Sequence, residues 1–159
     1  NTFAEQLSKL DTDCDIVTVF GSGNDMTFYD NTSHYGTIND TFTTIENSSV
    51  FACVKHFIEQ FIADRPTTKL VIFSPTAWNG YNYPQLTSNP RMYYYNEMLK
   101  ELCGKYQIPF VDMYSESGFI PSNSAFMNKY TVDGTHPNTA GHRFFAGMFE
   151  NALNKHMAY

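Results

Sequence analysis

Cysteine is scarce in this 159-residue chain, and its placement excludes two common classes of small protein. The three cysteines, Cys14, Cys53 and Cys103, are far apart, and no two of them show the C-x-x-C spacing. Small secreted domains carry an even set of paired cysteines, and structural zinc sites need closely spaced ligands. The sequence therefore predicts neither a disulfide scaffold nor a zinc finger, and we expect the three thiols to be small core residues.

Positive charge is also sparse. Ten Lys+Arg stand against sixteen Asp+Glu, which gives a net charge of −6, and the chain has no basic run. Nucleic acids and anionic membrane surfaces bind clustered positive charge, so both are poor partners for this chain. No apolar stretch approaches the roughly 20 residues of a membrane span. The content of 42% hydrophobic residues, including 16% aromatic ones, is enough to build one core, so we expect a single domain over residues 1–159.

The glycine patterns of cofactor-binding and nucleophile loops are missing. Residues 21–23 read Gly-Ser-Gly, but no third glycine completes G-x-G-x-x-G, which disfavours a flavodoxin-like nucleotide or flavin binder. Phe20 stands where G-x-S-x-G needs its first glycine. His34, His56 and His156 have no carboxylate or cysteine at ligand spacing. We therefore expect no metal and no organic cofactor.

Segments typical of strands and helices alternate along the chain. Short apolar, β-branched and aromatic runs predict strands at 16–20, 70–73 and 110–113. Apolar residues at helical spacing predict helices at 2–10, 50–62, 90–106 and 140–155. Ser48 or Ser49 can cap the second of these helices, and the stretch between 113 and 140 is predicted to be irregular. Such alternation implies parallel strands with right-handed crossovers, hence a three-layer α/β/α domain with a parallel sheet.

A carboxylate precedes a histidine by three positions just before the last predicted helix. Residues 133–138 read Asp-Gly-Thr-His-Pro-Asn. A turn with this spacing can bring Asp133 to the imidazole of His136, fix its tautomer and stabilise the imidazolium formed during hydrolysis. The alternative is structural, with an Asp- and Asn-rich helix start in which His136 is a neighbour of the cap. Both interpretations stay open on this motif alone.

A second polar motif follows the first predicted strand. Residues 21–25 read Gly-Ser-Gly-Asn-Asp, directly after the apolar run 16–20. Small residues at the carboxyl end of a parallel strand let the backbone and short polar side chains reach a ligand. Asn24 can therefore direct an amide N–H at a developing oxyanion.

Taken together, the two motifs resemble the third and fifth sequence blocks of the SGNH (GDSL-type) hydrolases, whose fold is flavodoxin-like. The resemblance implies that Asn24 is an oxyanion-hole donor and that Asp133 and His136 are members of a catalytic triad. Gly23 and Asp25 would then line the substrate site. Residues 36–40, which read Gly-Thr-Ile-Asn-Asp, also look like the middle of such domains, so the likeness extends from about residue 15 to the end of the chain.

The chain departs from that family in two places. Ser22 occupies a position where the third block usually has glycine. The first block, Gly-Asp-Ser-Leu or a variant that carries the serine nucleophile, is absent from the sequence. The resemblance thus implies that the N-terminal strands of the sheet are missing, and that a separate N-terminal segment or a second copy of the chain completes it. The family resemblance favours an extracellular or cell-surface location, although the sequence leaves the compartment open.

The function expected from the resemblance is hydrolysis of carboxylic esters, with acyl groups on carbohydrate as a candidate substrate. Trp78, in a loop rich in tyrosine, can line an acyl or sugar pocket or simply anchor its loop. The alternative to an enzyme is a glycan-binding or structural module that kept the fold without the serine. Ser74 is expected to cap a turn, since Pro75 follows it, and His142 is expected to be a packed or hydrogen-bonded structural histidine.

Overall fold

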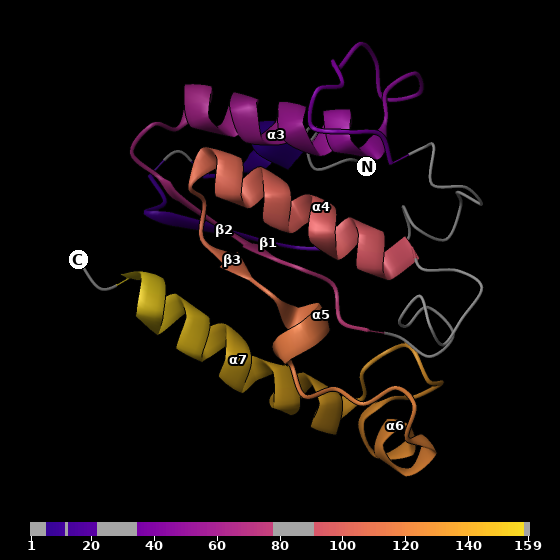
Figure 1. Cartoon of the computed structure of the whole chain (residues 1–159). Coiled ribbons are helices and arrows are strands. Elements are labelled where there is room, and N and C mark those ends of the chain that lie inside the picture. Colours follow the sequence, from indigo (N-terminus) through magenta and orange to yellow (C-terminus); the bar gives the residue numbers. More distant parts are fainter. Residues whose placement is uncertain (1–5, 12, 22–34, 78–90, 158–159) are drawn as a thin grey trace.

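The computed structural model describes residues 6–11, 13–21, 35–77 and 91–157 (Figure 1). Three parallel strands form its sheet in the order β1 (Ile16–Phe20), β2 (Lys69–Phe73) and β3 (Phe110–Val111). The register pairs Ile16 with Lys69 in β1 and β2, and Phe73 with Val111 in β2 and β3. Helices lie on both faces, as predicted: α3 and α4 cover one face and α7 covers the other (Figure 1).

Strand β2 is the centre of the fold because its side chains supply both layers of core. Leu70 and Ile72 belong to the core beneath α3 and α4, whereas Val71 and Phe73 belong to the core beneath α7. All four are at most 5% exposed. A strand buried on both faces needs apolar residues at every position, which is why residues 70–73 form a continuous run rather than an alternating one.

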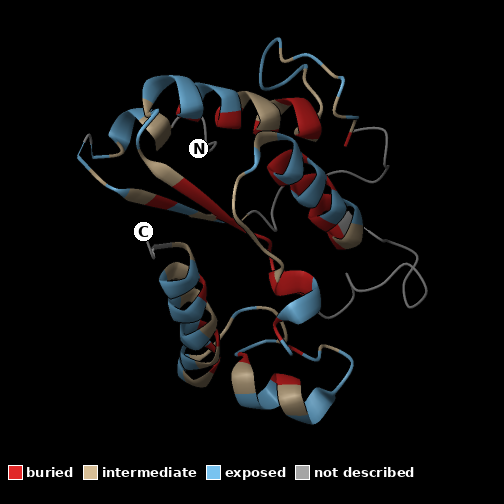
Figure 2. Ribbon diagram, turned by 60° about the vertical axis from the view of Figure 1, so that its left-hand side comes forward, coloured by how far each residue is buried: buried red, intermediate tan, exposed pale blue. Residues whose placement is uncertain are grey.

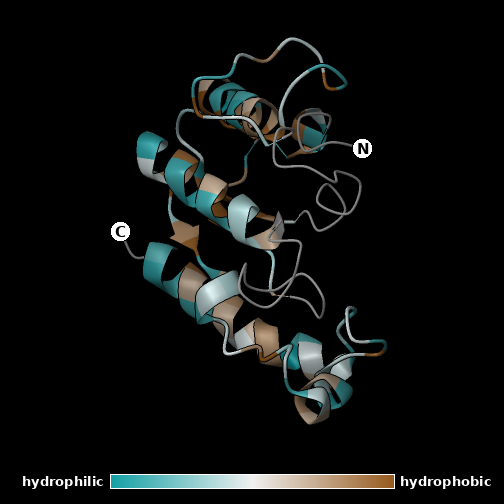
Figure 3. Cartoon of the chain, turned by 45° about the vertical axis from the view of Figure 1, so that its right-hand side comes forward, coloured by the Kyte–Doolittle hydropathy of each residue, from teal (hydrophilic) through white to brown (hydrophobic). Residues whose placement is uncertain are grey.

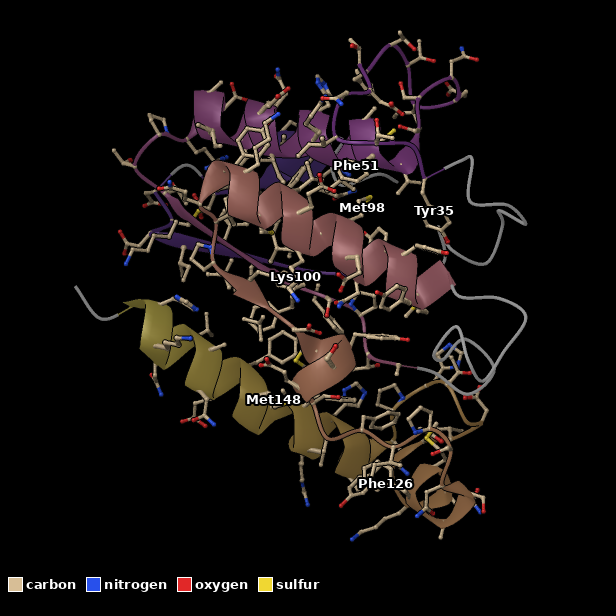
Figure 4. All side chains as sticks on the ribbon, viewed as in Figure 1. Tyr35, Phe51, Met98, Lys100, Phe126 and Met148 are labelled. Atoms are coloured by element: carbon tan, nitrogen blue, oxygen red, sulfur yellow. The ribbon has the colours of Figure 1, made fainter. Side chains whose placement is uncertain are left out.

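Helices α3 (Val50–Asp64) and α4 (Arg91–Tyr106) occupy the positions predicted from their apolar spacing. The hydroxyl of Ser49 accepts a hydrogen bond from the backbone N–H of Ala52 at 3.2 Å, so Ser49 is the cap of α3. Buried residues mark the inner sides of both helices in Figure 2, and Figure 4 shows Phe51 and Met98 in the core between them. The side of α4 seen in Figure 3 is mostly hydrophilic.

Helix α7 (Thr139–Met157) runs antiparallel to β2 on the second face. Its direction follows from two contacts: Phe149 stacks on Phe73 at the end of β2, with ring centroids 4.2 Å apart, and the carbonyl of His156 accepts from Lys69 Nζ at the start of β2. Because a helix rises about 1.5 Å per residue, Thr139 lies ~15 Å beyond Phe149. The start of α7 therefore extends past the carboxyl ends of the strands.

Two short helices replace backbone that the sequence led us to expect as strand or irregular. The predicted third strand continued to Met113, but Met113 begins α5 (Met113–Glu116), because the carboxylate of Asp112 accepts from the N–H of Ser115 at 2.8 Å and ends the strand. In the predicted irregular stretch, Asn123 caps α6 (Ser124–Tyr130). Short helices of this kind are fixed by their caps and by packing, which leave little periodicity in the sequence.

Two further expectations are settled by the described residues. Of the helix predicted at 2–10, residues 2–5 lie outside the described ranges; Gln6 is helical and leads into the 3-10 turn η1 (Leu7–Lys9). Cys103 is 1% exposed, and burial raises the pKa of its thiol to about 12, whereas Cys14 and Cys53 are only half-buried. None of the helices within the described ranges is both long enough and apolar enough to cross a membrane.

Candidate active site

A short polar loop joins α6 to α7 and carries both residues of the Asp-x-x-His motif. Thr131 and Pro137 form an isolated antiparallel bridge at its base. The N–H of Val132 donates to the carbonyl of His136 at 2.8 Å, which closes the loop over residues 132–136. We call residues 131–137 the Asp133 loop. Since it precedes α7, it lies at the end of the sheet where the strands terminate (Figure 1).

Within this loop the carboxylate of Asp133 lies against the imidazole of His136. The distance from Oδ2 to Nδ1 is 2.7 Å, while Oδ1 accepts from the backbone N–H groups of His136 at 2.8 Å and Thr135 at 3.0 Å. Gly134 has φ of 85°, a conformation that side chains with a Cβ rarely adopt, which explains the glycine inside the motif. The loop thus orients the ring through one nitrogen and leaves Nε2 for another partner.

The electrostatics of the pair favour an ionised aspartate. The backbone N–H of His136, then the imidazole and the N–H of Thr135, lower the pKa of the Asp133 carboxyl to about 2. The side chains are 76% exposed for His136 and 52% for Asp133. The pair is therefore negatively charged on its carboxylate at neutral pH, and its imidazole is reachable from outside.

The Asp133 loop is held by Thr131, a residue that the sequence analysis did not single out. Its buried hydroxyl donates to the carbonyl of Met127 at 2.7 Å and accepts from the N–H of Gly134 at 2.9 Å. One side chain therefore ties the glycine of the motif to the last turn of α6. A threonine just after a helix carries no distinct sequence signal, because the same residue type is common in loops.

Asn138, the last residue of the Asp- and Asn-rich helix start in the structural interpretation, holds the other end of the loop. Its amide nitrogen donates to the carbonyls of Lys129 at 3.0 Å and Thr131 at 3.2 Å, and its Oδ1 accepts from the N–H groups of Ala140 and Gly141, at 2.9 and 3.0 Å. Asn138 is thus the N-terminal cap of α7, and its side chain also links the start of α7 to the end of α6. The structural interpretation of the motif is correct for Asn138, and it coexists with the Asp133–His136 contact.

Gly141 completes this frame through its small size. A Cβ on Gly141 would collide with the carbonyl oxygen of Tyr130, so only glycine lets the first turn of α7 approach the end of α6 this closely. Beneath the frame, Phe126, Tyr130 and Phe144 form an aromatic cluster with ring centroids 4.6 to 5.8 Å apart. The exposed acid–base pair therefore lies above a cluster of aromatic rings in mutual contact.

Other predicted residues are placed as follows. Gly23, Asn24, Asp25 and Trp78 lie outside the described residues. Ser74 is fully buried, and its hydroxyl accepts from the N–H of Tyr114 at 3.1 Å; its structural role is confirmed, although it caps the start of α5 rather than a turn at Pro75.

The structure also describes His142 and His56, two histidines that the sequence analysis considered for a structural role and a metal site, respectively. His142 is exposed on α7, so the packed alternative of its prediction is wrong. It lies in the first turn of α7, where its backbone N–H donates to the carbonyl of Asn138 at 2.9 Å. His56 is half-buried and stacks on Phe42, with ring centroids 4.0 Å apart.

Comparison with known proteins adds a family and a set of related folds. The model of the GDSL-like lipase/acylhydrolase family matches residues 1–144. No curated protein matches the chain. A solved structure from Lactobacillus plantarum is similar with a TM-score of 0.73 and 22% identity, over 96% of this chain and 73% of that one.

Two further solved structures carry descriptions of activity. The lipase/acylhydrolase from Enterococcus faecalis gives a TM-score of 0.61 at 15% identity, covering 98% of this chain and 72% of that one. A catalytic mutant of Axe2, an acetylxylan esterase from Geobacillus stearothermophilus, gives 0.61 at 17% identity, over 96% and 68%. At such identities the similarity shows the fold.

Proposed function

Because this chain belongs to the GDSL-like lipase/acylhydrolase family, we propose that it supplies the acid–base pair of a serine ester hydrolase. The observation that carries the proposal is the 2.7 Å contact between Asp133 Oδ2 and His136 Nδ1. That contact assigns Nδ1 to the carboxylate and leaves Nε2 to take a proton from a hydroxyl. The exposure of the imidazole is compatible with a nucleophile and a substrate that approach from outside.

The proposed reaction is a double displacement. A serine oxygen attacks the ester carbonyl carbon while His136 Nε2 accepts the serine proton, and Asp133 stabilises the resulting imidazolium. Asn24 and backbone N–H groups would hold the oxyanion. The tetrahedral intermediate expels the alcohol, which takes the proton from the imidazolium. Water then repeats the attack on the acyl-serine, releasing the acid and restoring the hydroxyl.

The proposed substrates are carboxylic esters, with acyl groups on carbohydrate as the first class to test. The similarity to an acetylxylan esterase supports this choice. Gly23, Asp25 and Trp78 are the proposed substrate-lining residues. A comparison of turnover on a short-chain aryl ester and on an acetylated xylo-oligosaccharide would test the class. Hydrolysis of the aryl ester with none of the sugar ester would contradict the carbohydrate assignment.

The serine is proposed to come from a segment that adds a strand beside β1. Among the described strands β1 pairs only with β2, so its other edge is open there. Thr18 is exposed, and Phe20, which contacts Phe149 edge-on, is still 48% exposed. An exposed strand edge with apolar side chains favours pairing with a further strand. An N-terminal segment outside this sequence, or a second copy of the chain, would provide it.

A fluorophosphonate probe, which reacts with activated serines, tests both parts of this proposal. We expect no labelling of the 159-residue chain alone, and labelling once an N-terminal segment carrying the Gly-Asp-Ser block is joined to it. Labelling of the chain alone at Ser22 or Ser74 would overturn the missing-nucleophile argument. A joined chain that is folded, unlabelled and inactive on esters would instead support the non-catalytic, glycan-binding alternative.

A further inference from the structure

A groove lies at the end of the sheet opposite the Asp133 loop, where the strands begin. The ends of α3, α4 and α7 and the start of β2 border it, and these elements meet at the left of Figure 1. Its volume is about 600 Å³. This falls within the range of roughly 300–1,000 Å³ typical of small-molecule sites.

The groove has an apolar floor and an apolar rim. Phe61 and Leu70 line it while remaining 1% and 5% exposed, so they form a floor fixed by the core. Ile62, on α3, lines it too and is 42% exposed, and Ile108 and Pro109 add apolar surface on the side of β3. Exposed apolar side chains that gather at a concave surface are more informative than single ones, because they can be covered by a ligand.

Each charged side chain among the described residues lining the groove is basic. They are Arg65 and Lys69, near the end of α3 and the start of β2, and Lys155, near the end of α7. This is unexpected in a chain of net charge −6 with ten Lys+Arg. The guanidinium of Arg65 donates to the backbone carbonyls of Asp11 at 2.5 Å and Leu10 at 2.8 Å, which orient it without neutralising its charge.

Two other residues that line the groove, His156 and Tyr106, interact with charged neighbours. The pKa of His156 is lowered, first by burial and then by the positive charges of Lys155 and Lys69. The hydroxyl of Tyr106 already donates to the carboxylate of Glu59, so that acidic neighbour is engaged outside the groove. The groove therefore combines positive potential with a hydrocarbon surface.

Gln107, which also lines the groove, has an unusual backbone conformation. It follows α4 with φ of 54°, the left-handed conformation that helix ends usually assign to glycine. Its N–H and that of Ile108 close the end of α4 on the carbonyls of Gly104 and Cys103. A side chain is retained here despite the backbone cost of this conformation, and its amide belongs to the lining of the groove.

We propose that this groove binds a single-chain carboxylate with a hydrocarbon tail, the chemistry of a medium-chain fatty acid. The tail would cover Ile62 and the floor formed by Phe61 and Leu70. The carboxylate would lie among Lys155, Arg65 and the Gln107 amide. The inference does not depend on the esterase mechanism, since it concerns the opposite end of the sheet.

Calorimetric titration of the 159-residue chain with decanoate, below its micelle-forming concentration, tests the proposal. We expect saturable binding of one decanoate, and much weaker binding of both acetate, which lacks the tail, and decanol, which lacks the charge. Lys155→Glu should weaken decanoate binding about tenfold, which corresponds to roughly 1.4 kcal/mol. Lys100→Glu, a charge reversal at another exposed helical lysine that does not line the groove, is the matched control and should leave the affinity unchanged.

Ile62→Asn provides an independent variant because the residue is exposed and its loss should not disturb folding. It should weaken decanoate binding while leaving the circular dichroism spectrum unchanged. Equal affinities for Lys155→Glu and Lys100→Glu, or no saturable binding at all, would overturn the proposal. Sedimentation of the chain with phosphatidylglycerol vesicles without any decanoate binding would also overturn it, since the ligand would then be a bilayer headgroup rather than a free carboxylate.

Discussion

Two aspartate-centred loops in this protein look alike in sequence and differ in what their carboxylates contact. The first, residues 36–40, which we call the Asp40 loop, precedes α3; the second is the Asp133 loop before α7. Each contains a glycine in the left-handed region, Gly36 at φ of 72° and Gly134 at 85°. Hydrogen bonds lower the pKa of both carboxyls, from Ser49 first in the case of Asp40 and from the His136 backbone first in the case of Asp133.

In the Asp40 loop, these bonds connect the carboxylate to the loop itself and to Ser49 at the start of α3. The carboxylate of Asp40 accepts from the hydroxyls of Thr37 at 2.9 Å and Ser49 at 2.7 Å, and Ser49 is itself the cap of α3. Lys55 Nζ donates to the carbonyls of Ile38, at 3.0 Å, and of Asp40. The role of the Asp40 loop is therefore structural: its hydrogen bonds attach the segment before α3 to that helix.

The Asp133 loop uses the same residue type differently. Its carboxylate is fixed by backbone N–H groups, and its remaining oxygen contacts an imidazole that is 76% exposed. Both loops contain an aspartate and a glycine, so the difference lies in the partner of the carboxylate. Hydroxyl groups bind Asp40 and give a structural loop, whereas an imidazole binds Asp133 and gives a pair that can transfer a proton. Variants in the two loops should separate activity from stability.

The largest expected effect is on turnover. In the enzyme completed with its serine segment, His136→Ala should lower kcat/KM on a short-chain aryl ester by roughly 10⁴-fold or more, because the serine loses its base. The melting temperature should change little, since the side chain is exposed. His142→Ala, which removes an exposed histidine of α7 outside the Asp133 loop, is the control and should keep full activity. Full activity of His136→Ala would remove the residue from the site.

The next effect compares the two glycines. Gly134→Ala should cost about 1–2 kcal/mol of unfolding free energy, the penalty for a Cβ in the left-handed region, because no atom of the described residues lies within 4 Å of that Cβ. Gly36→Ala should cost more, since its Cβ would also collide with Asp40 and Ser49. Urea unfolding of the two variants measures the difference. Equal costs would contradict the crowded geometry of the Asp40 loop.

A smaller effect on stability is expected when a hydrogen bond between the Asp40 loop and α3 is removed. Ser49→Ala removes the cap of α3 and one donor to Asp40, and should destabilise the chain by about 1 kcal/mol. Ester turnover by the completed enzyme should be unchanged below the melting temperature. A loss of kcat that exceeds the loss of folded protein would show that the Asp40 loop contributes to the site.

The smallest effect is a titration. By carbon-detected NMR, Asp133 should titrate with a pKa of about 2, below its ordinary 3.8, and His136→Ala should raise this pKa while leaving that of Asp40 unchanged. Because the folded pKa is lower than the unfolded one, the contribution of Asp133 to stability is complete above pH 3.8 and is lost as the pH falls towards 2. An Asp133 pKa that does not respond to removal of the imidazole would contradict the contact.

The local chemistry of this protein was determined by its sequence. The continuous run 70–73 predicted a strand buried on both faces, and the apolar spacing of residues 50–62 predicted α3, because burial on a fixed period leaves a direct record in residue type. The Asp-x-x-His spacing predicted that the carboxylate of Asp133 can reach the imidazole of His136, since three residues and a glycine are enough to close such a turn. Asn24, in the other predicted motif, remains a sequence-based proposal.

Tertiary structure decided how the pair is held and where it lies. Thr131 ties Gly134 to the end of α6, and Asn138 joins α6 to α7, through partners on neighbouring elements that no local pattern specifies. The same holds for α5, whose first turn depends on the hydroxyl of Ser74, which directly follows β2 and lies 40 residues before its partner Tyr114. Hydrogen bonds and close approaches between distant segments depend on how the layers pack, which a sequence read locally does not contain.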